Sequence, residues 1–115
     1  MAEPRRRRVL LVGSEGLGRG DDPLGLTLLE NFLKTLVGNP RRSEGIICWN
    51  AGVKLLTADS PVVQLLRDLQ GLGVEILACK TCVSHFGLQG KLGAGEIVTM
   101  PVIVDTLLQA DVLTV

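Results

Sequence analysis

The stretch Gly73-Val74-Glu75-Ile76-Leu77-Ala78-Cys79-Lys80-Thr81-Cys82 decides the fold that this chain is expected to adopt. It begins with a short, nearly continuous apolar run and ends in two cysteines that are separated by two residues. Apolar runs without polar alternation are typical of strands that are covered on both faces of a parallel sheet. We therefore predict a buried strand over Val74–Ala78, with Cys79 at its carboxyl end, where a helix begins.

Four further runs of the same kind predict the rest of a sheet. They are Val9–Val12, Ile46–Trp49, Ile97–Met100 and Val112–Val115. Helical patterns separate consecutive runs, and strands that alternate with helices build a parallel sheet with helices on both faces. The sequence thus predicts an α/β fold, with a basic tail over residues 1–8 and a single domain over residues 9–115. We expect this domain to have three layers, α/β/α, and a five-stranded, mainly parallel sheet.

Capping residues and apolar periodicity place four helices between these strands. The first has Asp22 as its expected N-cap, Pro23 at its first position and Gly38 at its end. The other three are expected to begin at Ser60-Pro61, after Thr81 and near Pro101. The apolar residues expected to form the inner face of the last helix are Val104, Leu107 and Leu108.

This architecture directs attention to particular loops. In open parallel sheets, ligands bind beyond the carboxyl ends of the strands, where the strand order reverses. The segments that follow the expected strands are Gly13–Asp22, Asn50–Asp59, Cys79–Cys82 and Met100-Pro101. We expect the functional site among them.

The composition excludes several classes of function. The chain has 115 residues with 12 Lys and Arg against 12 Asp and Glu, so it has no net charge and its length suits one domain. Only 3% of its residues are aromatic, which leaves few side chains to stack on nucleic-acid bases. The apolar run Val9–Val12 is too short for a signal-peptide core or a membrane span. We expect a cytoplasmic protein with no nucleic-acid partner, no membrane partner and no cofactor.

The thiol pair carries the main expectation for chemistry. Helix-start N–H groups, together with Lys80 and Lys54, are expected to lower the pKa of Cys79 and favour its thiolate, which attacks persulfides and electrophilic sulfur or selenium. Cys82 is close enough in sequence to form a disulfide with Cys79 or to share a metal with it. Three cysteines, an odd number, argue against a disulfide framework. The pattern alone leaves four interpretations open: buried structural thiols, metal ligands, a dithiol redox pair and a sulfur-carrying nucleophile.

A metal site would draw on Cys79, Cys82 and His85, which follow one another at three-residue intervals, with Cys48 as the fourth ligand. The chain has no second Cys-x-x-Cys or Cys/His pair. Cys48 lies within an apolar run and is expected in the core. His85, beside Phe86, is expected to be a partly buried structural side chain.

Two other loops bear on the site. The loop Gly13–Asp22 is rich in glycine but matches neither of the two phosphate-binding fingerprints, and its two aspartates disfavour phosphate, so we expect a tight structural turn there. The segment Trp49–Lys54 sets a ring, an amide and a cation at the same edge of the sheet. It is expected either to form a pocket wall or simply to pack, with Lys54 in solvent.

Over whole segments from Val9 to Val115, the chain resembles the DsrE-type family of sulfur relay proteins, and most closely the C-terminal DsrE-like domain of YedF-type selenium metabolism proteins. The segments that carry the resemblance are Gly18-Arg19-Gly20-Asp21, Asn50-Ala51-Gly52-Val53-Lys54-Leu55, Gly73-Val74-Glu75-Ile76-Leu77 leading into Cys79-Lys80-Thr81-Cys82, and Gly87-Leu88. The reactive cysteine of the family lies at the end of the third strand, eight residues before a glycine. Cys79 and Gly87 have this spacing.

The resemblance implies a DsrE-like α/β domain that forms a homo-oligomer (a dimer, trimer or hexamer) and carries sulfane sulfur as a persulfide on Cys79, with Cys82 as its companion. It implies sulfur donor and acceptor proteins, such as a TusA/SirA-like protein or a cysteine desulfurase. The candidate pocket residues are Gly18, Arg19, Asp21, Asn50, Gly52, Lys54, Lys80 and Thr81.

The sequence departs from the YedF pattern in two places. Lys80 stands where the family has a glycine, and the first expected strand begins at residue 9, so we expect no TusA/SirA-like domain before it. Either a separate protein supplies that partner, or the chain serves a different sulfur or selenium task. The alternative function is a non-enzymatic oligomeric module whose Cys79, Cys82 and His85 bind zinc or sense the redox state.

Overall fold

The computed structural model describes residues 6–41 and 43–115. The strands and helices follow one another in the order expected, with one additional 3-10 helix, η1. The elements are β1 (Arg7–Val12), α1 (Asp22–Val37), β2 (Gly45–Cys48), η1 (Asn50–Leu56), α2 (Val63–Gly71), β3 (Glu75–Cys79), α3 (Lys80–His85), β4 (Glu96–Val98), α4 (Met100–Leu108) and β5 (Ala110–Thr114).

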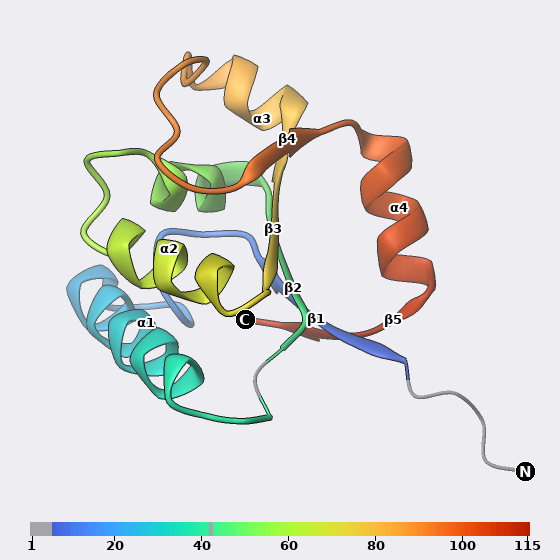
Figure 1. Ribbon diagram of the computed structural model, residues 1–115. Helices are drawn as coiled ribbons and strands as arrows, with labels where there is room; N and C mark the ends of the chain where they lie inside the picture. The colour runs from blue at the N-terminus through green and yellow to red at the C-terminus, as the bar shows by residue number, and fades with distance from the viewer. Residues whose placement is uncertain (1–5, 42) are drawn as a thin grey trace, which may run out of the picture.

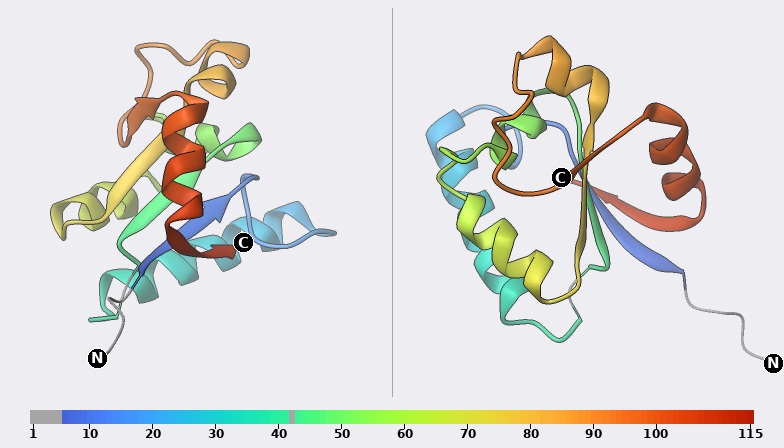
Figure 2. Two further views of the ribbon diagram at one scale, coloured as in Figure 1. Left: turned by 90° about the vertical axis from the view of Figure 1, so that its right-hand side faces the viewer. Right: turned by 45° about the horizontal axis from the view of Figure 1, so that its top comes forward.

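The five strands form one sheet in the order β4-β3-β2-β1-β5, and all four neighbouring pairs are parallel. This confirms the α/β fold class. Figure 1 shows α1 and α2 on one face of the sheet and α4 on the other, with α3 beyond the carboxyl end of β3. The turned views in Figure 2 show the same three layers. The strand order reverses between β1 and β5, so the switch point of the topology lies there.

The central strands are buried on both faces, as their apolar runs predict. Leu10 of β1 and Ile46 of β2 belong to the larger hydrophobic cluster, which α1, η1 and α2 complete. Leu77 and Cys79 of β3 point to the opposite face and share a second cluster with Ile103 of α4. This alternation directs the Cys79 side chain toward the layer that α4 forms.

The N-cap of α1 lies one residue earlier than expected. Asp21, not Asp22, is the cap, because its Oδ1 accepts a hydrogen bond of 2.9 Å from the Leu24 N–H. Asp22 is the first residue of the helix, where its negative charge interacts favourably with the positive end of the helix dipole. Gly38 ends the helix as predicted.

The expected inner face of α4 is wrong for Val104 and Leu108, whereas Leu107 is partly buried and packs against the second cluster. Only Ile103 of this helix is buried, whereas Val104 is 42% exposed and Leu108 is 71% exposed. Nearly all residues of α4 are apolar, so periodicity could not separate the inner face from the outer one. The edge strand β5 is exposed from Asp111 onward, because it has a neighbour on one side only and α4 covers only part of its face.

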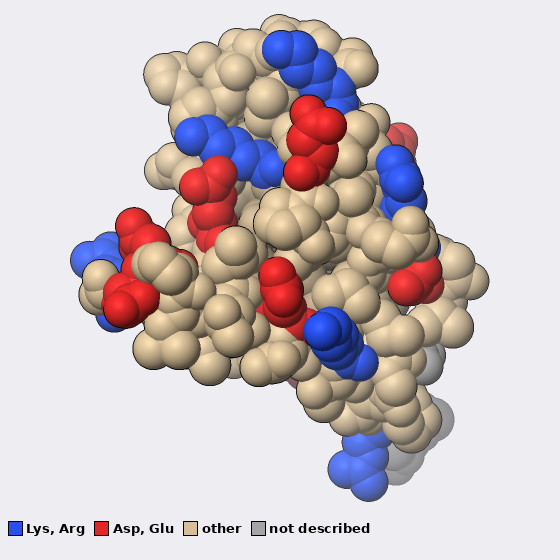
Figure 3. Space-filling view, turned by 90° about the vertical axis from the view of Figure 1, so that its left-hand side faces the viewer, with Lys and Arg blue, Asp and Glu red and all other residues tan. Residues whose placement is uncertain are grey.

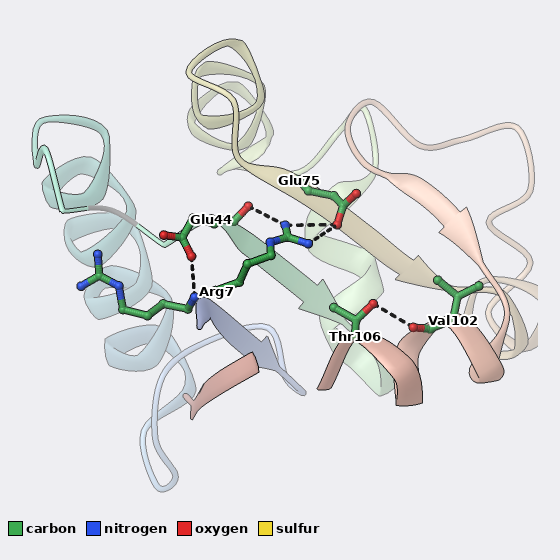
Figure 4. A network of polar contacts seen from close by, with 6 residues as sticks. Arg7, Glu44, Glu75, Val102 and Thr106 are labelled. Carbon is green, nitrogen blue, oxygen red and sulfur yellow. Dashed lines mark hydrogen bonds and ion pairs between the residues drawn. The ribbon is translucent and has the colours of Figure 1, made fainter. Parts of the chain in front are cut away.

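Strand β1 begins at Arg7, two residues before the expected start, so Arg7 and Arg8 do not belong to a tail. They pair with Ala110 and Asp111 of β5. The Arg7 guanidinium also lies 3.3 Å from the Glu75 carboxylate and donates a hydrogen bond to the Glu44 carbonyl at 3.2 Å, as Figure 4 shows. Sheet pairing and this ion pair therefore extend the strand through the arginines. Of the remaining expected tail, Arg6 is exposed and precedes the strand, and residues 1–5 lie outside the described residues.

Positive and negative side chains are mixed on the surface, in keeping with their equal numbers in the sequence (Figure 3). Figure 3 shows Lys and Arg side chains interspersed with Asp and Glu on the face over α1 and α2, so the described residues of this face form no continuous basic patch. Among the described helices, none has the length and hydropathy that crossing a membrane requires.

Candidate functional site

The two thiols of the Cys-x-x-Cys motif lie at the carboxyl end of β3. Cys79 is the last residue of the strand and the N-cap of α3, and Cys82 lies within the first turn of this helix. Both cysteines are free. The residue Cys79 is only 1% exposed, whereas Cys82 has intermediate exposure. The helix begins at Lys80, directly after Cys79 and two residues earlier than the start expected after Thr81, so both thiols belong to one turn.

Both thiols border a cavity of about 470 Å³, here called the thiol cavity. Its lining residues are Trp49, Asn50, Cys79, Thr81, Cys82, His85, Phe86 and Met100. They come from the carboxyl ends of β2 and β3, from α3 and from the start of α4. The cavity therefore lies beyond the carboxyl ends of the strands, as expected for an open parallel sheet. It lies beside β2, β3 and β4, however, and not at the switch point between β1 and β5.

Asn50 connects the β2 loop to the thiols. Its backbone N–H donates a hydrogen bond to Cys82 Sγ at 3.0 Å. Asn50 also has a φ of 50°, in the left-handed region that few residues other than glycine and asparagine adopt. Backbone strain of this kind is concentrated at functional sites. The sequence indicated Asn50 as a pocket residue but gave no signal for its conformation.

Gly52 fixes the start of η1 against the end of β1. A Cβ atom at Gly52 would overlap the carbonyl oxygen of Val12, so no larger residue fits without movement of the backbone. The same oxygen accepts the Trp49 N–H at 3.1 Å. Gly52 is therefore a support beneath the loop that holds Asn50, and it does not line the cavity.

The surroundings of the thiols affect their ionisation in different ways. Burial raises the pKa of the Cys82 thiol, and the neighbouring Cys79 side chain, with which it shares a hydrogen bond, raises it further, whereas the Asn50 N–H opposes this shift. Complete burial raises the pKa of Cys48 to about 12. Cys48 is 1% exposed and lies in the larger core cluster, which confirms the expectation that it is a core residue.

The two lysines do not take the places expected for them beside the thiolate. The Lys54 ammonium lies over the Phe86 ring, 4.4 Å from its centroid, a cation–π contact. Lys80 is exposed on the first residue of α3, and neither lysine lines the thiol cavity. His85 differs from its expected state as well, because it is exposed and lines the cavity, with its ring 4.9 Å from that of Phe86.

The residues of the first loop form a separate hollow, here called the first-loop groove. Its volume is about 660 Å³. The candidate pocket residues Gly18, Arg19 and Asp21 line this groove and not the thiol cavity, while Ala51 lies at its border. The loop is drawn onto α1 by a hydrogen bond of 2.9 Å from the Leu17 N–H to the Gly25 carbonyl. The loop bends over residues 14–20 and is wider than the tight turn that the sequence predicted.

The geometry of the candidate ligands does not favour the metal hypothesis. Cys79, Cys82 and His85 all line the thiol cavity. Within residues 6–41 and 43–115, however, no three His, Cys, Asp or Glu side chains are grouped so that they could hold a metal ion. The zinc alternative therefore has no three-ligand set in this conformation.

Two lining residues, Phe86 and Met100, were absent from the expected pocket. Phe86 follows α3, and Met100 begins α4, where the loop rule had marked the segment without giving it a role. Both are apolar residues in segments that also contribute to the core. Only the tertiary arrangement shows that they also line a cavity.

No protein-family model matches the chain, and no curated protein matches its sequence. Similar folds occur among solved structures. One is MTH1491 from Methanobacterium thermoautotrophicum, a protein of unknown function, with a TM-score of 0.70, 20% identity, and coverage of 96% of this chain and 99% of that one. The ychN protein from E. coli has a TM-score of 0.68 and 22% identity over 96% of this chain and 99% of its own. The third is BT1422 from Bacteroides thetaiotaomicron, a conserved protein of unknown function, with a TM-score of 0.64, 19% identity and 95% coverage of each chain. At these identities the likeness shows the fold alone.

Proposed function

We propose that the protein is a sulfur or selenium relay protein of the DsrE type, in which Cys79 accepts a sulfane atom and holds it as a persulfide. The observation that carries this proposal is the pair of free thiols on one turn of α3, both of which face a cavity of about 470 Å³. The spacing of Cys79 to Gly87 supports it, and Gly87 ends the α3 segment with a φ of 65°. A thiol pair without a metal-ligand set favours sulfur chemistry over zinc binding.

The reaction has a simple balance of atoms and electrons. The Cys79 thiolate attacks the terminal sulfur of a donor persulfide, a sulfur–sulfur bond forms on Cys79, and the donor leaves as a thiolate. No oxidant is needed, because the sulfane atom moves without a change in its oxidation state. Delivery to the acceptor is the same step in reverse, with an acceptor thiolate as the nucleophile.

The cavity suits the storage of such a group. Trp49, Phe86 and Met100 give it apolar walls, and the Cys79 residue is nearly sealed from bulk solvent. A buried persulfide is protected from small thiols that would otherwise reduce it. The donor sulfur must then enter through the cavity mouth, on the side where Cys82 is partly exposed.

The charge of the cavity bears on the kind of donor. None of its lining residues is Lys, Arg, Asp or Glu, and His85 is the single titratable side chain besides the thiols. A small donor with several carboxylates would find no cationic partner among these residues. We therefore favour a persulfide on a protein segment, as on a cysteine desulfurase or a TusA/SirA-like protein.

The test is to load the reduced protein with a cysteine desulfurase and cysteine. Intact mass without reductant, followed by peptide mapping, should show one added sulfur on Cys79 that is lost on reduction. Cys79→Ser should remain folded and gain no sulfur, and Cys48→Ala, which removes a thiol of the core, should load as the wild type does. An unchanged mass while Cys79 can still be alkylated would contradict loading from this donor.

A further inference from the structure

The two thiols are arranged unequally within one helical turn. Cys79 is buried beneath α4, whereas Cys82 is partly exposed and accepts the Asn50 N–H. The side chains of Cys79 and Cys82 also share a hydrogen bond. A buried cysteine residue thus lies next to a partly exposed one, and both border the thiol cavity.

The spacing of the two residues permits a covalent bond between them. Residues three apart in a helical turn have Cα atoms about 5 Å from each other. Disulfides usually join residues whose Cα atoms are about 4.4–6.8 Å apart. The exchange therefore needs side-chain rotation within α3 and no rearrangement of the sheet.

We propose that Cys82 is a resolving thiol, which converts the persulfide on Cys79 into a Cys79–Cys82 disulfide and releases the bound sulfur as sulfide. This inference rests on the proposed function, because it starts from the loaded Cys79. It assigns to Cys82 the role that the carrier reaction alone does not require.

The step balances as follows. The Cys82 thiolate attacks the Cys79 sulfur, a bond forms between these two sulfurs, and the bond from Cys79 to the sulfane sulfur breaks. The sulfane atom takes the electron pair and leaves as hydrosulfide, so it is reduced while the two cysteines are oxidised. A dithiol reductant then restores both thiols, and it becomes a disulfide itself.

Asn50 fits this role for Cys82. Its N–H lies 3.0 Å from Cys82 Sγ, so it stabilises the charged form of the attacking sulfur. The disulfide can be reset by a dithiol that attacks at Cys82, because Cys82 is the more exposed of the two residues and borders the thiol cavity. The buried Cys79 sulfur would be the leaving group in that step.

The experiment follows one loaded sample over time. The protein is loaded with cysteine desulfurase and cysteine, separated from both under anaerobic conditions, and monitored by intact mass and by assay of free sulfide. The wild type should lose its added sulfur as sulfide in step with the loss of two hydrogens, and mapping should place the disulfide between Cys79 and Cys82. In Cys82→Ser the persulfide should last roughly tenfold longer or more, because the nearby thiol is gone. Cys48→Ala should behave as the wild type.

The outcomes separate the two proposals. If the wild type loads but its persulfide lasts as long as that of Cys82→Ser, Cys82 is not a resolving thiol and the carrier function stands. If neither protein loads, the carrier function fails and the resolving role fails with it. An independent arm needs no loading: a strong thiol oxidant such as diamide should form a Cys79–Cys82 disulfide in the unloaded wild type. The absence of this linkage would overturn the resolving role by itself.

Discussion

The thiol cavity and the first-loop groove lie beyond the carboxyl ends of neighbouring strands, but they differ in what lines them. The groove follows β1, next to the switch point. It is lined by residues of the first loop and of the start of α1, and none of its lining residues is a cysteine or a histidine. The thiol cavity follows β2 and β3 and has two thiols, the rings of Trp49 and Phe86, and a histidine on its walls. Topology indicates where space opens in such a sheet, whereas reactive groups decide which space can support chemistry.

The largest difference between the thiol cavity and the first-loop groove is expected in sulfur loading. Cys79→Ser removes the proposed acceptor thiol, so loading by a cysteine desulfurase should fall to background. Peptide mapping shows whether the neighbouring free thiol of Cys82 takes up any sulfur. Arg19→Ala, on the first-loop groove, should load as the wild type does. The intact masses of both variants are compared under the same conditions. A loss of loading in Arg19→Ala would show that the first-loop groove takes part in sulfur loading.

The pH dependence of alkylation should sharpen the description of the thiol cavity. Burial and the Cys79 side chain raise the pKa of Cys82, so its thiolate is scarce at neutral pH and its alkylation rate should rise by about tenfold per pH unit from pH 7 to pH 9. Cys48, whose pKa is about 12, should stay unmodified in the folded protein. Mass spectrometry of alkylated peptides measures both thiols at once.

His85 also lines the thiol cavity and provides the control for this prediction. In His85→Gln the same slope should remain, because burial and Cys79 cause the shift. A rate for Cys82 that is already maximal at pH 7 would show that its thiolate is stabilised and would contradict the raised pKa.

The backbone between the two regions can be tested at Gly52. A Cβ atom there would meet the Val12 carbonyl oxygen at the end of β1, so Gly52→Ala should lower the free energy of unfolding by about 1–3 kcal/mol. Gly71→Ala is the matched control, because nothing lies within 4 Å of its added Cβ and Gly71 ends an exposed helix turn. Urea denaturation of the two variants compares them. Equal stability would show that the η1 loop moves freely against β1.

The sequence was sufficient for the strands and for the thiol pair, and the reason is physical. Strands that are buried on both faces leave uninterrupted apolar runs, and a Cys-x-x-Cys after such a run must lie at the carboxyl edge of the sheet. The inner face of α4 was not predictable, because Val104 and Leu108 are as apolar as the buried Ile103. The position of Asn50 depends on a backbone angle that no pattern of residues specifies.

The separation of the pocket residues into two hollows has a similar cause. Gly18, Arg19 and Asp21 follow β1, so the edge rule grouped them with the thiols. The close packing of Gly16 against Gly25 instead holds this loop on α1. Such a contact between two glycines depends on the absence of side chains, and apolar periodicity does not register it.

The smallest effect should come from the cap of α1, on the groove side. Asp21→Ala removes the acceptor of the Leu24 N–H and should lower the free energy of unfolding by about 1 kcal/mol. Asp22→Ala should cost about 0.3–1 kcal/mol at low salt, less as salt is added, because it removes only a charge near the helix dipole. Thermal or urea denaturation in low and high salt distinguishes them. A larger and salt-independent loss of unfolding free energy in Asp22→Ala would show that Asp22, and not Asp21, is the N-cap. Sulfur loading should be unchanged in both variants, because the cap lies outside the thiol cavity.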